Sequence, residues 1–109
     1  MIDVKMIRSN GAVNGFEISG HAESGPYGHD LVCAAVSAVS IGTVNAIERL
    51  CHTEPHVEQG GEGGYLKAIL PSGLTEDVAE KARILLEGML VSLETIEHDY
   101  QQYIKITHR

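Results

Sequence analysis

Hydrophobic periodicity predicts that the chain opens with a hairpin. Alternating apolar and polar residues over Met1–Arg8 predict a first strand, and Phe16–Ser19 predicts a returning strand. Asn-Gly dipeptides at 10–11 and 14–15 tolerate positive φ and are typical of the turns between such strands. The second strand is therefore expected to end just before His21.

The longest apolar stretch, Leu31–Leu50, predicts a helix with apolar or small residues on every face until Asn45. A helix that is apolar all round is buried, so we expect it to lie between the sheet and another surface and to be the most buried element. Asp30 is its candidate N-cap, because a carboxylate accepts the free N–H groups of the first turn. Small residues that would let a second subunit approach closely are Ala34, Ala35, Ala38 and Gly42.

The rest of the chain repeats the order hairpin, helix. His56–Gln59 and Gly64–Leu70 predict two strands, and the glycine-rich segment between them indicates a hairpin, because no Gly-Lys-Ser/Thr or helix follows as in a phosphate loop. Thr75 is the candidate N-cap of an amphipathic helix that ends near Ile96. Its core stripe is Val78, Ala82, Leu85, Met89, Leu93 and Ile96.

A last alternating strand, Tyr103–Thr107, completes the order β-β-α-β-β-α-β. This order predicts an α+β fold in which two helices pack on a largely antiparallel five-stranded sheet. Residues 1–109 are expected to form a single domain, since a chain of 109 residues is long enough for one core and too short for two.

Charge and composition limit the classes of partner that the protein is expected to bind. A formal net charge of −7 argues against direct nucleic-acid binding, which needs clustered Lys and Arg, and suits a basic partner. The sequence contains no uninterrupted run of about 20 apolar residues, which a membrane-spanning helix would need. The N-terminal residues lack the pattern of a signal peptide. We therefore expect a cytoplasmic protein. Cys33 and Cys51 should both be free thiols, because a helix would hold them roughly 27 Å apart, beyond the reach of a disulfide.

The segment Gly20–His29 is expected to be a loop, since three glycines and a proline disfavour regular structure. It is either an ordinary surface connection or a mobile flap that covers a bound peptide. In the second interpretation the residues that gate the substrate are Gly25, Tyr27 and Gly28.

His21 and Cys33 are the candidate base and nucleophile. With Asp30 as cap, Cys33 would lie near the third helical position, where free N–H groups and the helix dipole favour a thiolate. Backbone N–H groups near Cys33 are candidate oxyanion-hole donors. Asp30 either caps the helix or orients His21. Ser37, one turn after Cys33, is interpreted as a packed or hydrogen-bonding residue that supports the site.

The residues Gly20-His21-Ala22, followed by Tyr27-Gly28-His29-Asp30-Leu31-Val32-Cys33-Ala34-Ala35-Val36-Ser37, resemble the motif of the bacterial ribosomal-processing cysteine proteases, the Prp or YsxB-like family. Chain length, element order and the closing strand are similar too, so the resemblance covers nearly the whole chain; only His29 is less typical.

The resemblance implies a cysteine endopeptidase with a His21–Cys33 dyad, which acts as a homodimer. Its implied substrate is the precursor of a large-subunit ribosomal protein, whose short N-terminal extension is removed at a hydrophobic, aromatic-containing site. No cofactor is expected for this chemistry.

Two other classes of protein stay open. His21, His29 and Cys33 are good zinc ligands, and the last two have the i, i+4 spacing of a helical metal pair, so a zinc-binding protein or zinc hydrolase is one alternative. A non-enzymatic, ribosome-associated dimer module is the other. The remaining candidate residues, Cys51, His52 and His56, are interpreted as parts of a helix end and a strand.

Overall fold

The structure is a computed structural model that describes residues 1–21, 26–60 and 64–108, and the side chains of residues 26–30 lie outside this description. The elements in chain order are β1 (Ile2–Ser9), β2 (Ala12–Gly20), α1 (Pro26–Cys51), β3 (His56–Gln59), β4 (Tyr65–Ile69), α2 (Glu76–Asp99) and β5 (Ile104–His108). The predicted order and the α+β class are confirmed.

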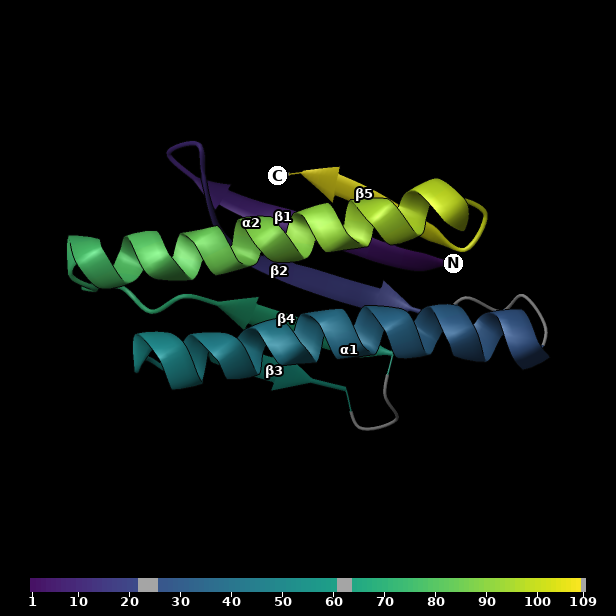
Figure 1. The fold of residues 1–109 in the computed structure, drawn as a ribbon, viewed down its shortest axis with the longest axis horizontal. Helices are drawn as coiled ribbons and strands as arrows, with labels where there is room; N and C mark the ends of the chain where they lie inside the picture. Colours follow the sequence, from purple (N-terminus) through teal and green to yellow (C-terminus); the bar gives the residue numbers. More distant parts are fainter. Residues whose placement is uncertain (22–25, 61–63, 109) are drawn as a thin grey trace.

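The strands form one mixed sheet in the order β3-β4-β2-β1-β5. The pairs β1–β2, β2–β4 and β3–β4 are antiparallel, whereas β5 runs parallel to β1. Both helices cover the same face of this sheet (Figure 1). The two hairpins account for the β1–β2 and β3–β4 pairs, the β2–β4 pair joins the hairpins, and the parallel pair arises because α2 returns the chain to the far edge.

Only the first of the two Asn-Gly dipeptides forms the turn of the first hairpin. Asn10 and Gly11 adopt positive φ angles of 54° and 82° between β1 and β2, as the first Asn-Gly dipeptide predicts. The second dipeptide does not form a turn, and β2 begins at Ala12 instead of Phe16. A register shift after Ile7 accommodates it within the strand. Gly15 serves a different purpose here, because a Cβ at this position would collide with the backbone of β4.

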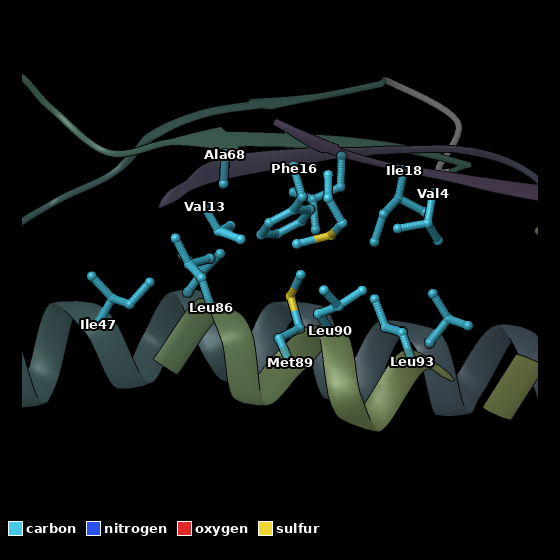
Figure 2. Packing of buried hydrophobic residues seen from close by; sticks show 14 of the residues in the cluster. Val4, Val13, Phe16, Ile18, Ile47, Ala68, Leu86, Met89, Leu90 and Leu93 are labelled. Carbon is cyan, nitrogen blue, oxygen red and sulfur yellow. The ribbon is translucent and has the colours of Figure 1, made fainter. Parts of the chain in front are cut away.

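The hydrophobic core lies between the helices and the covered face of the sheet. Figure 2 shows Leu86, Met89, Leu90 and Leu93 of α2 and Ile47 of α1 directed toward side chains of the sheet such as Val13, Phe16 and Ile18. The predicted stripe of α2 is therefore core, with Ala82, Met89 and Leu93 buried and Val78, Leu85 and Ile96 half-buried at its border. The predicted cap is confirmed as well, since the Thr75 hydroxyl accepts a hydrogen bond from the Val78 N–H.

Helix α1 departs from expectation at its start. It begins at Pro26, where a proline is well accommodated because its missing N–H would have no helical partner. Asp30 is therefore the fifth helical residue and does not cap the helix. The predicted loop is correspondingly shorter: Gly20 ends β2, and residues 26–29 are helical. Residues 22–25 lie outside the described part.

The expectation that α1 is buried on every side is also wrong for the single chain. One face packs on the sheet through Val32, Val36 and Ile47, whereas Leu31 and Leu50 on the outer side are 56% and 64% exposed. The segment Leu31–Cys51 is long and apolar enough to cross a membrane by length and composition alone, which is equally true of many core helices. Its packed inner face places it in the core.

Candidate active site

His21 directly follows β2 and is held in place through its backbone. The Gly20 N–H donates a hydrogen bond of 2.9 Å to the Gly64 carbonyl, which extends the pairing of β2 with β4. The amino group of Met1 donates to the His21 carbonyl. His21 as a whole residue is exposed. The histidine is therefore accessible, while hydrogen bonds to its own carbonyl and from the preceding Gly20 fix the backbone.

Cys33 lies on α1, half-buried, with its side chain against the core. Because α1 begins at Pro26, Cys33 is the eighth helical residue and not the third. The N–H groups without helical partners belong to the first four residues of a helix, so the N–H of Cys33 is not one of them; which backbone N–H groups form an oxyanion hole stays a prediction. The expectation that a helix terminus activates this thiol is therefore wrong. His21 remains its proposed activating partner.

His21 and Cys33 line the same pocket, which has a volume of about 270 Å³. It opens where the end of β2, the middle of α1 and the β3–β4 hairpin meet. Ser37 lines it one turn after Cys33 and is exposed. Ser40 lies deeper and is buried, with its hydroxyl donating a 2.8 Å hydrogen bond to the Val36 carbonyl. The other described residues that line it are Ile2, Ile18, Gly20, Val36, Ile41, Gln59, Gly64, Tyr65 and Leu66.

The other candidate residues lie away from this pocket or outside the described part. Both cysteines are free thiols, and Cys51 is buried at the end of α1. His52, the next residue, leaves the helix with a positive φ of 55°. His56 belongs to β3. The interpretation of these three as helix end and strand is confirmed. Tyr27, Gly28 and Asp30 are helical, so they do not belong to a loop; Gly25 lies outside the described residues, and the roles of all four stay predictions.

The zinc alternative gains no support from the described side chains. Among them, no three His, Cys, Asp or Glu residues lie close enough together to hold a metal ion. The side chain of His29 is not among those described, so its part in a metal site stays untested.

The β3–β4 hairpin contributes residues that the sequence did not identify. Gln59, Gly64 and Leu66 line the pocket, although the glycine-rich segment predicted only a turn. The ring of His21 lies directly against Gly64. The sequence predicted only the hairpin itself. The pairing of β2 with β4, which brings His21 and Gly64 together, depends on contacts between distant segments.

Comparison with known proteins identifies the family. A family profile described as cysteine protease Prp matches residues 1–105. The chain belongs to this family. The ribosomal processing cysteine protease Prp of Bacillus subtilis (strain 168) is 44% identical over 108 residues, which cover 98% of this chain and 96% of that protein. The Prp of Staphylococcus aureus (strain Mu50) is 38% identical over 103 residues, 94% of this chain and 93% of that one.

Solved Prp structures share the fold over the full length. The S. aureus protease Prp in complex with a covalently linked product peptide aligns with a TM-score of 0.87 and 36% identity, covering all of both chains. The same protease with a substrate peptide aligns at 0.85 and 35%, again over both whole chains. Membership in the Prp family makes this chain a cysteine protease, consistent with an endopeptidase.

Proposed function

We propose that the protein is a cysteine endopeptidase in which Cys33 is the nucleophile and His21 the general base. The observation that carries this proposal is that these two side chains, from separate elements, line one pocket of a Prp-family fold. The pairing supplies the two groups that thiol catalysis needs, a sulfur that can become a thiolate and a base that can take its proton.

The reaction follows from these two groups. His21 takes the proton of the Cys33 thiol, and the sulfur attacks the carbonyl carbon of the scissile peptide bond. The C–N bond then breaks, the leaving amine takes the proton from His21, and a thioester joins Cys33 to the N-terminal product. A water molecule, deprotonated by His21, hydrolyses the thioester and restores the thiol.

We propose the precursor of a large-subunit ribosomal protein as substrate, cut after its short N-terminal extension. Relatives of this chain are ribosomal processing proteases, and one of them was solved with a substrate peptide. The apolar side chains Ile18, Val36 and Leu66 in the pocket suit a hydrophobic residue beside the cut. The net charge of −7 suits a basic substrate, and a cytoplasmic location would give access to it.

We also propose that the protein acts as a homodimer. The outer side of α1 carries the small residues Ala34, Ala38 and Gly42, all exposed in the single chain, beside the exposed Leu31 and Ile41. Small side chains let another helix approach closely, and burial of the apolar ones would stabilise the contact.

The two free cysteines make the nucleophile testable within one chain. Iodoacetamide near neutral pH should label Cys33, which opens to the pocket beside His21, before Cys51, which is only 5% exposed. Labelling of Cys33 should abolish cleavage, and His21→Ala should slow that labelling. Cys51→Ala is the matched control and should keep both activity and fast labelling. Labelled positions are read by peptide mass spectrometry.

The same experiment separates the alternatives. Cleavage that survives alkylation of Cys33 but is lost with a metal chelator would favour a zinc hydrolase. Absence of cleavage under every condition, with both thiols labelled slowly, would favour a binding module. A cysteine protease is indifferent to the chelator and sensitive to the alkylating agent.

A further inference from the structure

The imidazole of His21 lies against the backbone of Gly64. A Cβ added to Gly64 would lie 2.5 Å from Nε2, 2.8 Å from Cε1 and 3.3 Å from Cδ2 of that ring. All three atoms belong to one edge of the imidazole, so the ring approaches the glycine more closely than any other residue type allows. Gly64, the residue before β4, thus forms a surface for the ring.

The backbone of Gly64 is fixed in this place by two features. Its φ of +77° is a left-handed conformation that glycine adopts without strain. Its carbonyl accepts the hydrogen bond from the Gly20 N–H, immediately before His21. Because the paired register of β2 and β4 ends at Ser19 and Tyr65, this bond continues the ladder by one step and brings Gly64 and His21 together.

We propose that Gly64 is a positioning residue for the general base: its bare backbone receives the Nε2 edge of the His21 ring and so limits the orientations of the imidazole in the pocket that Cys33 also lines. The catalytic role of Gly64 rests on the proposed function, whereas the contact between Gly64 and the His21 ring does not depend on it. A side chain at position 64 would displace the ring, and small misplacements of a base cost a large share of the rate.

The test compares Gly64→Ala with Gly73→Ala. Both glycines have nearly the same left-handed φ, +77° and +80°, so both variants carry the same kind of backbone strain. A Cβ at Gly73 meets nothing within 4 Å, whereas one at Gly64 meets the His21 ring. Gly64→Ala should lower kcat by about tenfold or more with little change in KM, as expected for a misplaced group. Gly73→Ala should keep wild-type kcat.

Three further measurements distinguish displacement of the ring from a general loss of structure. The His21 ring resonances, assigned by their loss in His21→Ala, should shift in Gly64→Ala and stay unchanged in Gly73→Ala. The rate of Cys33 alkylation should fall in Gly64→Ala toward that of His21→Ala. If Gly64→Ala does not fold, Gly64→Asn adds the same Cβ at a smaller backbone cost, since Asn tolerates positive φ. In the wild type, nuclear Overhauser effects should join the Gly64 Hα protons to the His21 ring.

The outcomes distinguish this inference from the proposed function. Wild-type kcat and unshifted ring resonances in Gly64→Ala would overturn the positioning role, as would absence of the Overhauser effects. Shifted ring resonances with unchanged kcat would show that the contact exists but does not position a base, which also overturns it. A wild-type protein that does not cleave would contradict the proposed function instead, and the ring resonances would still report on the contact.

Discussion

At the scale of single residues, the proposed chemistry depends on His21 more than the sequence suggested. The motif predicts both members of the pair, and both line the pocket. The sequence also placed Cys33 at a helix terminus, where the helix itself would assist the thiolate. Since α1 begins at Pro26, that assistance is absent at the eighth helical residue. In the proposed mechanism the imidazole must therefore supply most of the activation, and its orientation matters correspondingly.

Glycines illustrate what can and cannot be predicted for individual residues. Gly11 follows directly from the Asn-Gly signal for a turn. Gly15 gives the same local signal, yet it is needed because β4 passes close to β2 at that point. Gly64 has a local reason as well, its left-handed φ of 77°, but its contact with the imidazole is visible only in the structure. Local sequence reports turn chemistry, whereas close approach of distant segments is decided by the tertiary structure.

This distinction gives a stability prediction. Gly15→Ala should lower the free energy of unfolding by roughly 1–3 kcal/mol, because its Cβ would push the backbone of β4 away. Gly88→Ala is the contrasting variant: it lies in the exposed part of α2, its Cβ meets nothing within 4 Å, and it should raise stability by about 0.5–1 kcal/mol. Urea unfolding curves measure both, and a neutral Gly15→Ala would contradict the close packing.

At the scale of elements, α1 shows why a helix can be predicted while its start cannot. The apolar run from Leu31 leaves no doubt that a helix exists. Pro26 is ambiguous, because proline both interrupts structure and starts helices. Gly25 and Gly28 around it favour a loop by local preference. Continuation of the helix back to Pro26 overrides those preferences, and the N-cap assigned to Asp30 was wrong for the same reason.

The exposed small and apolar residues on the outer face of α1 predict that two copies of the chain associate through this face. Ala38→Glu places a charge among exposed small and apolar residues, so it should convert the proposed homodimer to a monomer, because burial of an unpaired carboxylate is costly. Gln102→Glu adds the same charge at an exposed position after α2 and should leave the dimer intact. Sedimentation or light scattering measures both. A wild-type monomer, or an Ala38→Glu dimer, would contradict the assignment of this face.

At the scale of the whole molecule, element order is readable from the sequence but strand order is not. The two hairpins, the amphipathic stripe of α2 and the Thr75 cap are local features, and each is confirmed. The pairing of β2 with β4 and of β5 with β1 joins segments far apart in the chain. The β2–β4 pairing builds the pocket, because it brings the end of β2 beside the β3–β4 hairpin and under α1.

The pocket is therefore a product of the topology. His21 directly follows β2, Cys33 belongs to α1, and Gly64 directly precedes β4. The family motif contains the first two and implies their pairing. The third becomes visible only once the sheet is assembled, which is why the sequence predicts the His21–Cys33 pair but not the residue against which the His21 ring lies.

The most direct measurement of the central claim is processing of an N-terminally extended large-subunit ribosomal protein by wild type, Cys33→Ala and Cys51→Ala, followed by sizing of the product. The account predicts one defined cut by the wild type and by Cys51→Ala. Cys33→Ala should produce no cut, because no other described residue of the pocket supplies a thiol. Processing by Cys33→Ala at the wild-type rate would contradict the assignment of Cys33 as the nucleophile.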